Sequence, residues 1–397
     1  MQLRYAFRLD PTPGQRIALS RAFGCARVVF NDAVAARRAA HDAGQPFPTD
    51  AVLSKMLTET KRMPQRAWLS EVSAVVLQQA LADANSAYRN FFASLSGKRK
   101  GRKVGAPRFR SRRDSRQSIR FTSNARFKVL GNGRLRLPKI GDVPVRWSRS
   151  LPSVPSSVTV TLDSTGRYHA LFVVDVAGQP LPTARSEVGI DLGLTHFAVT
   201  SDGCKVANPR IARKAAVKLR RAQKELARRE KGSTNRSKSV RKVAKIHGRV
   251  RDIRRDWLHK LSATMIRENQ AVYVEDLAVS GMARTTLARS VHDAGWSMFV
   301  DMLEYKAKRH GRTFGKVSRW FPSTRMCSKC GMTGEGKPLS VREWTCSCGV
   351  VHDRDVNAAI NILAAGRADS SMLVELESVG ASVPRSAVKQ EPTGSVA

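Results

Sequence analysis

Near the N-terminus, alternating apolar and polar residues predict a strand followed by a capped helix. Residues 3–9 alternate Leu, Tyr, Phe and Leu with other side chains, the period of two expected for a half-buried strand. Thr12 then precedes Pro13 and Gln15, an order typical of a capping box with proline in the first helical turn. Apolar residues recur at helical spacing from this capping box to Phe30 and again over 70–95, which predicts a helical subdomain.

Between residues 117 and 178 the pattern changes to short segments rich in β-branched and aromatic side chains. Glycine-containing turns, such as the one at 131–133, separate these segments. The predicted strands lie at 119–121, 127–130, 135–137, 143–147, 158–162 and 168–174. Five or six short strands suggest a small β-barrel, and the N-terminal strand is a candidate to join it across the helical insertion.

From residue 186 strands and helices alternate, so the chain as a whole is predicted to be an α+β multidomain protein. Predicted strands are 188–191, 197–200, 271–274 and 314–317, and predicted helices are 211–231, 235–268, 296–309 and 354–365. The second of these helices carries a narrow apolar stripe formed by Val240, Val243, Ile246, Val250, Ile253, Trp257 and Leu261. Residues 367–397 show no clear period, and we expect them to be mostly disordered.

The charge of the chain narrows the range of partners. Among 397 residues there are 70 Lys and Arg against 32 Asp and Glu, a formal net charge of +38. Such an excess repels itself unless a polyanion neutralises it, which favours nucleic acid. We find no run of 18 apolar residues and no signal-peptide core. We therefore expect a prokaryotic cytoplasmic protein that is nucleoid-associated when bound to DNA, with its thiols reduced.

Two segments concentrate the positive charge. Residues 98–116 hold ten Lys or Arg and one Asp, with Phe109 and Phe121 interleaved, so a solvated linker and a nucleic-acid contact are equally good interpretations. Residues 205–260 hold 21 basic and four acidic side chains on a predicted helical hairpin, more than solubility requires. The candidate nucleic-acid contacts are Lys98, Arg99, Lys100, Arg102, Lys103, Arg108, Arg110, Lys218, Arg221, Lys224, Arg228, Lys242, Lys245 and Arg249.

Three carboxylates occur where a metal-dependent nuclease needs them. Asp191 and Glu275 each end an apolar strand, and Asp355 opens the last helix, with Asp353 as the alternative third ligand. Taken singly, each has a structural explanation: a turn residue, a surface ion pair or a helix cap. Taken together they favour two Mg²⁺ or Mn²⁺ ions held for phosphodiester hydrolysis.

Four of the six cysteines have the spacing of a zinc ribbon. Cys327 and Cys330 are separated by two residues, whereas Cys346 and Cys348 are separated by one. In a reducing compartment such thiolates favour a closed structural Zn²⁺ site, with free or redox-active thiols as the weaker alternative. His352 could replace a sulfur that does not reach the metal. The other two cysteines, Cys25 and Cys204, are interpreted as packing residues.

These motifs resemble the TnpB family of transposon-encoded, RNA-guided DNA nucleases, relatives of the type V CRISPR effectors. The resemblance covers nearly the whole chain and is carried by F-R-L-D-P-T-P-G-Q, G-I-D-L-G-L, V-E-D-L, F-P-S-T-R-M-C-S-K-C-G and H-D-R-D-V-N-A-A-I-N-I. The family's catalytic carboxylates correspond to Asp191, Glu275 and Asp355, and its zinc ligands to Cys327, Cys330, Cys346 and Cys348. The one-residue gap between Cys346 and Cys348 departs from the family pattern.

The resemblance implies a domain plan. A wedge-type β-barrel would comprise 1–10 and 117–184, with a helical recognition domain at 11–116. A ribonuclease H-like RuvC nuclease domain would comprise 185–319 and 351–366, including the basic hairpin 211–268. Residues 320–350 would form the zinc-ribbon insert.

The resemblance also implies an RNA-guided DNA endonuclease, whose partners would be a guide RNA and a double-stranded DNA target. Its oligomeric state could be a monomer or a homodimer. Two alternatives are a nuclease-inactive repressor or transposition regulator and an RNA-independent transposase. A plain zinc-ribbon nucleic-acid-binding protein would leave Asp191 and Glu275 unexplained.

Overall fold

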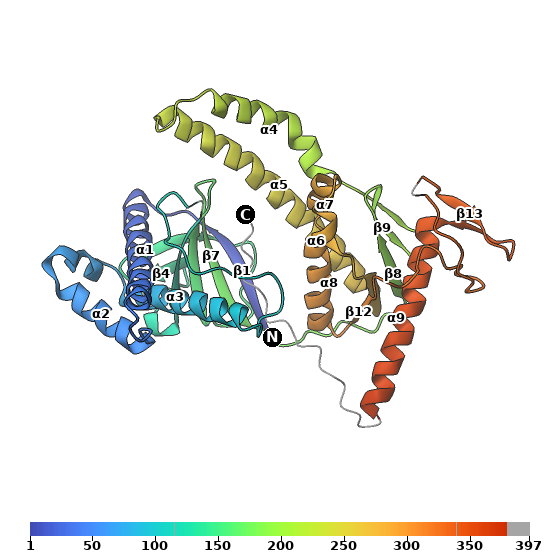
Figure 1. Ribbon diagram of the computed structural model, residues 1–397, viewed down its shortest axis with the longest axis horizontal. Helices are drawn as coiled ribbons and strands as arrows, with labels where there is room; N and C mark the ends of the chain where they lie inside the picture. The colour runs from blue at the N-terminus through green and yellow to red at the C-terminus, as the bar shows by residue number, and fades with distance from the viewer. Residues whose placement is uncertain (115, 339, 379–397) are drawn as a thin grey trace. The chain divides into compact units, whose positions relative to one another are not determined.

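The computed structural model describes residues 1–114, 116–338 and 340–378 of the chain (Figure 1). The chain divides into two compact units, each containing helices and a β-sheet, in agreement with the predicted α+β class. The first unit consists of Met1–Ala177 together with Arg229–Lys245, and the second of Gly178–Arg228 and the residues from Ile246 onward.

A seven-stranded sheet forms the base of the first unit. Its strands are β1 (Gln2–Leu9), β2 (Gln117–Thr122), β3 (Lys128–Val129), β4 (Arg134–Leu137), β5 (Gly141–Arg146), β6 (Ser157–Leu162) and β7 (Tyr168–Asp175). They lie in the order β2-β6-β7-β1-β5-β4-β3, so the N-terminal strand joins the sheet at its centre, as predicted. Among the described strands β2 and β3 do not pair, which leaves a half-barrel where a closed barrel was expected. The edge strand β3 has only two residues, both exposed, and is too short to close the sheet.

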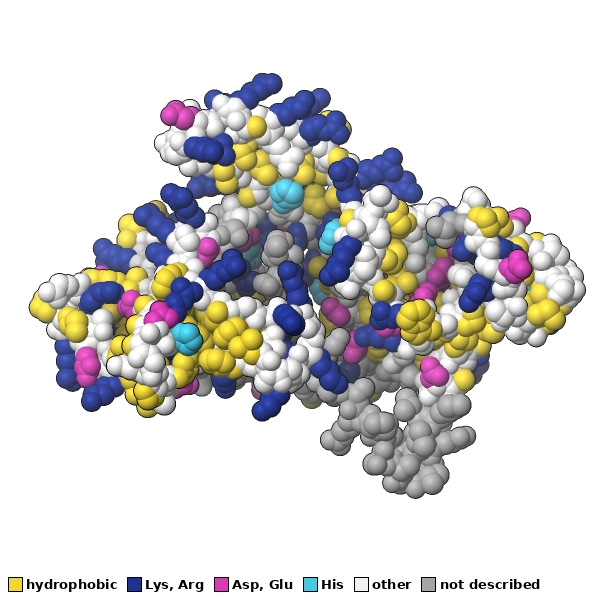
Figure 2. Space-filling view, viewed as in Figure 1, with side chains coloured by type: hydrophobic (Ala, Val, Ile, Leu, Met, Phe, Trp, Pro, Cys, Tyr) yellow, Lys and Arg dark blue, Asp and Glu magenta, His cyan; other side chains and the backbone are white. Residues whose placement is uncertain are grey.

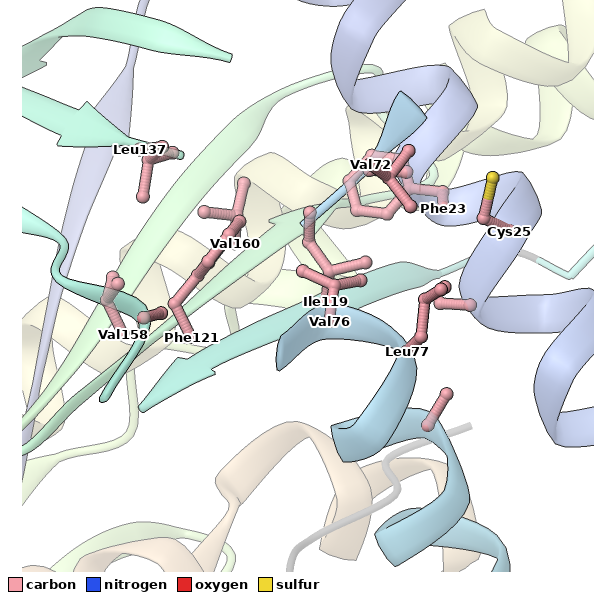
Figure 3. Packing of buried hydrophobic residues seen from close by; sticks show 14 of the residues in the cluster. Phe23, Cys25, Val72, Val76, Leu77, Ile119, Phe121, Leu137, Val158 and Val160 are labelled. Atoms are coloured by element: carbon pink, nitrogen blue, oxygen red, sulfur yellow. The ribbon is translucent and has the colours of Figure 1, made fainter. Parts of the chain in front are cut away.

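Two helices, α1 (Pro13–Asp42) and α3 (Ala74–Leu95), pack against this sheet. Helix α2 (Asp50–Arg62) packs on α3 and on the 3₁₀ helix η1 (Pro64–Glu71), and a second 3₁₀ helix, η2 (Ser123–Ala125), follows β2. The predicted capping box is present, since the Thr12 side chain and the Gln15 side chain each accept the other residue's backbone N–H. Phe23, Leu77 and Phe121 pack between helices and strands in one continuous core (Figure 3).

The basic segment 98–116 is held against α1. The Asn31 side chain donates to the carbonyl of Arg110 and accepts from its backbone N–H, at 3.0 and 2.7 Å. The Arg38 guanidinium donates to the carbonyl of Pro107 at 2.7 Å and stacks over the Phe109 ring. Anchored at several points, the segment is not a loose linker. The expectation that Phe121 contributes to nucleic-acid contact is wrong, because its ring is fully buried in the core.

The second unit is built on a mixed five-stranded sheet in the order β10-β9-β8-β11-β12. Its strands are β8 (Glu187–Leu192), β9 (His196–Thr200), β10 (Lys205–Ala207), β11 (Ala271–Glu275) and β12 (Thr313–Val317). The first three are antiparallel neighbours, whereas β8, β11 and β12 run parallel. The parallel strands place the C-terminal ends of β8 and β11 at the same edge of the sheet.

The helices that follow these strands are α4 (Ile211–Ala227), α5 (Thr234–Glu268), α6 (Val279–Met282), α7 (Ala288–Ala294), α8 (Trp296–His310) and α9 (Arg354–Ser378). The apolar stripe predicted on α5 is partly wrong, since Val240 and Ile253 are exposed while Leu258 and Ile266 are buried. The C-terminal half of this helix packs into the core of the second unit with Trp296 and Phe299 of α8, and this contact selects its buried face. Among the described helices, none has an apolar stretch long enough to cross a membrane.

The last helix is longer than predicted. Disorder was expected from residue 367, yet α9 continues to Ser378, and residues 379–397 lie outside the described part of the chain. Contacts with the sheet hold the first part of this extension, because Arg367 forms an ion pair with Glu187 and the Tyr273 hydroxyl donates to Ser370 at 3.2 Å. These long-range contacts cannot be detected as a local period.

A two-stranded ribbon of β13 (Glu343–Thr345) and β14 (Val351–Asp353) immediately precedes α9. The strands are antiparallel, with Trp344 opposite His352. The ribbon and the loop containing Cys327 form a small separate core around Trp344.

Candidate active site

Two carboxylates lie side by side at the edge of the second sheet. The parallel pairing of β8 and β11 sets Ile190 opposite Val274. Asp191 and Glu275 follow these residues by one position, so their side chains emerge from adjacent strands on the same face. Both residues are partly exposed to solvent.

Helix α9 crosses the same face and brings the third carboxylate to this edge. A Cβ added to Gly189 would lie 2.1 Å from the Ala359 carbonyl oxygen, so the helix backbone rests directly on the strand. From Gly189 to Asp191 the strand advances about 6.6 Å. From Ala359 back to Asp355 the helix covers about 6 Å. Asp355 is therefore positioned over the end of β8, beside Asp191.

The pKa of Asp191 reflects both neighbouring carboxylates. Burial, followed by the negative charges of Asp355 and Glu275, raises the pKa of Asp191 to about 7. Burial and the adjacent Asp276 also raise the pKa of Glu275. Crowded carboxylates of this kind either hold a proton or bind a cation.

Asp353 has a different role from Asp355. Its Oδ1 accepts the backbone N–H groups of Asp355 and Val356 at 3.1 and 3.0 Å, which makes it a cap for α9. Its Oδ2 accepts from the Lys205 ammonium at 2.6 Å. Although burial alone would raise the pKa of Asp353, these hydrogen bonds lower it on balance. The Asp353 carboxylate is thus already satisfied by the protein.

An arginine from the ribbon connects two parts of the site. The Arg342 guanidinium lies 3.4 and 3.5 Å from the Asp355 carboxylate oxygens and 3.2 Å from the Thr195 hydroxyl. Thr195 belongs to the turn that follows Asp191. Neither Arg342 nor Gly189 was singled out from the sequence, since both act through contacts between distant segments.

The four predicted cysteines lie together in one group. Their sulfur atoms all lie within 4.8 Å of one another, with Cys327–Cys348 at 3.8 Å and Cys330–Cys346 at 3.7 Å. Tetrahedral Zn²⁺ with bonds of about 2.3 Å places its sulfurs about 3.8 Å apart. The cluster therefore fits a structural zinc ion.

Two glycines explain how the shorter cysteine pair still reaches the cluster. Gly331 and Gly349 both have positive φ, at 75° and 84°. The N–H of Gly331 donates to the carbonyl of Cys327, and the N–H of Gly349 donates to that of Cys346, both at 2.9 Å. The turn after Cys346 therefore closes with one residue fewer than the turn after Cys327. His352 is not needed as a substitute ligand, and its Nε2 lies 3.0 Å from the Cys327 sulfur.

Two buried asparagines tie the cysteine loop to α9. The side-chain amides of Asn357 and Asn361 donate to the carbonyl of Met326 at 2.8 and 2.7 Å. Asn357 also accepts the backbone N–H of Ser328 at 2.9 Å. The helix that carries Asp355 is thus attached to the cysteine loop on both sides of Cys327.

The remaining cysteines differ from each other. Cys25 is buried on α1, as predicted, and burial raises the pKa of its thiol to about 11. Cys204 is exposed in the turn before β10, so its interpretation as a packing residue is wrong. Its backbone N–H donates to Asp202, and that turn is formed by polar contacts instead of apolar packing.

Most candidate nucleic-acid contacts are exposed. Figure 2 shows Lys and Arg side chains gathered along α4 and α5. Arg99 and Arg110 are exceptions, being partly buried. Arg110 lies over the Phe30 ring and pairs with Asp83 at 3.3 Å, so its guanidinium is already held by contacts within the protein.

Three family models match successive parts of the chain. Residues 1–46 match a helix-turn-helix domain of the OrfB_IS605 type, although this stretch contains β1 and the single long helix α1. Residues 157–286 match OrfB_IS605, described as a probable transposase. Residues 296–362, which contain the four cysteines, match the Cas12f1-like TNB domain.

Known proteins resemble this chain over nearly its full length. A Streptomyces pristinaespiralis protein with the provisional name RNA-guided DNA endonuclease is 43% identical over 98% of this chain and 96% of its own. InsQ of Escherichia coli, with the same provisional name, is 32% identical over 98% of this chain and 97% of its own. The structure of Cas12f1 with its guide RNA and target DNA aligns at a TM-score of 0.53 and 13% identity, over 88% of this chain and 82% of that one.

The fold is thus of the class seen in Cas12 effectors, an α+β architecture with a half-barrel sheet and a four-cysteine cluster. The chain belongs to the TnpB family of transposon-encoded RNA-guided DNA endonucleases, as its motifs predicted.

Proposed function

We propose that this protein is an RNA-guided DNA endonuclease that cuts DNA at one site formed by Asp191, Glu275 and Asp355. The observation that carries the proposal is the convergence of these carboxylates from two parallel strands and one helix. The names of its relatives point to the same activity.

The mixed sheet with α9 across it supports a ribonuclease H-like RuvC domain, comprising 185–319 and 351–366 with the zinc ribbon inserted between. The half-barrel would be the wedge domain and the α1–α3 block the recognition domain.

The carboxylates suit divalent cations. They are hard oxygen ligands. Burial, followed by the repulsion of the neighbouring carboxylates, raises the pKa of Asp191, and bound cations would relieve this unfavourable concentration of negative charge. Two bound Mg²⁺ or Mn²⁺ ions would activate the attacking water and stabilise the leaving oxygen.

The other parts of the chain would hold the nucleic acids. A structured guide RNA would neutralise the exposed basic side chains of α4, α5 and the segment 98–116. The guide would pair with one DNA strand, and the protein would contact that heteroduplex through its backbone and shape. A short DNA motif beside the target would be read by the first unit.

The test begins with RNA that copurifies with the protein expressed from its native locus. One dominant structured RNA with a variable end supplies the guide for a cleavage assay with matched and mismatched DNA targets. We expect Mg²⁺-dependent cutting of the matched target by the parent protein and none by Asp191→Ala. Equal cutting by Asp191→Ala would refute the assignment of the site.

The same experiment separates the alternatives. A nuclease-inactive regulator would carry the guide and bind the matched target without cutting it. An RNA-independent transposase would act on DNA without any copurifying RNA. The intact trio of carboxylates disfavours the regulator, and the near full-length relatives named as RNA-guided disfavour the transposase.

A further inference from the structure

Trp320 exposes a large apolar ring to solvent in the loop between β12 and the first cysteine. Its exposed fraction is 86%, and among the large hydrophobic side chains that the structure describes only Val154, at 91%, exceeds it. A tryptophan ring offers more area for burial than any other side chain. Because this ring stays in water, its burial contributes nothing to the stability of the fold.

The backbone on both sides of Trp320 is fixed. Its own N–H donates to the Ser318 hydroxyl at 3.3 Å, and the N–H of Phe321 donates to the Ser318 carbonyl at 3.0 Å. Phe321 packs against the small core around Tyr273, and the Asn361 amide donates to the Ser323 carbonyl at 2.8 Å. The indole is therefore presented by a rigid turn.

This turn lies next to the carboxylate site. Val317, three residues before Trp320, pairs with Glu275 across the parallel strands. Arg319 forms an ion pair with Asp276, which directly follows Glu275. The loop that carries Trp320 therefore begins at the end of the sheet where Glu275 lies.

The charge around the turn indicates which kind of molecule would bind the exposed ring. From residue 314 to residue 334 the sequence contains four basic residues and no acidic one. Lys316 and Arg319 form ion pairs with Glu304 and Asp276, whereas Arg325 and Lys329 are exposed. An apolar ring within a basic segment matches a polymer that has both phosphates and flat bases. A hydrophobic protein partner would not require this charge.

We propose that Trp320 is a stacking platform for an unpaired base of the DNA strand entering the carboxylate site. This inference rests on the proposed function. The indole face would pack on the base while the exposed Arg325 and Lys329 side chains contact the phosphates, which would fix the position of the strand relative to the three carboxylates. The contact is independent of sequence, because every base has a flat π face.

The test uses the full chain with Asp191→Ala to prevent cutting, and a short fluorescently labelled oligodeoxythymidylate as the probe. Trp320→Ala and Trp320→Leu are expected to weaken binding roughly tenfold, since neither offers a flat ring. Trp320→Phe keeps a ring and should bind within about threefold of the parent protein. Quenching of tryptophan fluorescence by the oligonucleotide should be lost in all three variants and kept in Trp68→Phe.

Val154→Ala is the matched control for an exposed apolar side chain, and it should bind like the parent protein. Unchanged affinity and quenching in Trp320→Ala would overturn the proposal. So would a parent dimer that becomes monomeric in Trp320→Ala, because the ring would then cover a second copy of the chain. Guided cleavage by the protein with intact Asp191 is measured separately, so failure of the platform is distinguished from failure of the proposed function.

Discussion

Asp191 is the residue whose chemistry depends most on its surroundings. Its ordinary pKa of 3.8 is raised to about 7 by burial and by two neighbouring carboxylates. Because the folded-state pKa is the higher one, the folded protein holds the proton more tightly than the unfolded chain. The resulting stabilisation is complete below about pH 4 and is lost as the pH rises through 7.

We therefore predict that, without Mg²⁺ or Mn²⁺, Asp191→Asn stabilises the fold at pH 8 by several degrees in melting temperature and has little effect at pH 4, where the parent carboxyl is already neutral. Thermal unfolding of both proteins with zinc retained measures this difference. Mn²⁺ affinity of the parent protein should also fall by up to about tenfold per pH unit below 7, as the proton competes with the metal. A melting-temperature difference independent of pH would contradict the raised pKa.

The two aspartates at the start of α9 are predicted to respond differently to substitution. Asp355→Asn should reduce guided cleavage by more than about a hundredfold, because even residues that only support metal ligands cost 10–100-fold. Asp353→Asn keeps an acceptor oxygen for the cap and should cut within about threefold of the parent protein. Asp353→Ala should lose about 1 kcal/mol of stability. Equal loss of cleavage in both Asn variants would make Asp353 a ligand as well.

At the scale of elements, the site depends on how closely α9 approaches β8. A Cβ at Gly189 would lie 2.1 Å from the Ala359 carbonyl oxygen and 2.5 Å from the Leu363 nitrogen. Both atoms belong to the helix backbone and cannot rotate away. Gly189→Ala must therefore displace α9 together with Asp355.

We predict that Gly189→Ala lowers the stability of the fold by about 3 kcal/mol, at the upper end for overpacking, and abolishes cleavage. Chemical denaturation and a guided cleavage assay measure the two effects. Gly105→Ala is the control, because a Cβ there meets nothing within 4 Å. If Gly189→Ala retained full cleavage, α9 would not be positioned by this contact.

Local pattern sufficed to predict most elements but not their mutual contacts. The strands β8, β9, β11 and β12 and the helix start at Arg354 follow from apolar runs and turn residues that are close in sequence. The half-barrel, the buried face of α5 and the extension of α9 depend on segments that meet only in the fold. Asp191 and Glu275 could be chosen from their places at strand ends, and Asp355 from the start of the last helix. The roles of Arg342 and Trp320 depend on contacts and exposure that only the folded structure shows.

At the scale of the whole molecule, a formal charge of +38 makes binding of a polyanion strongly dependent on salt. The exposed side chains of Lys218, Arg221 and Lys224 lie on α4, among the basic residues gathered there. Replacing these three by Ala should make the slope of log affinity for guide RNA against log salt shallower by about two, since each phosphate contact contributes about 0.7 for single strands. Fluorescence anisotropy at several salt concentrations measures this slope.

The matched control removes the same charge from residues that already have partners. Arg21, Arg136 and Arg146 pair with Glu71, Asp142 and Asp10, respectively. Replacing these three by Ala also lowers the formal net charge from +38 to +35, that is 38 minus 3. We expect this triple variant to change the slope by less than about one, because a paired guanidinium contacts few phosphates. If both triple variants changed the slope equally, net charge alone would govern the binding, and α4 would have no special role in holding the guide.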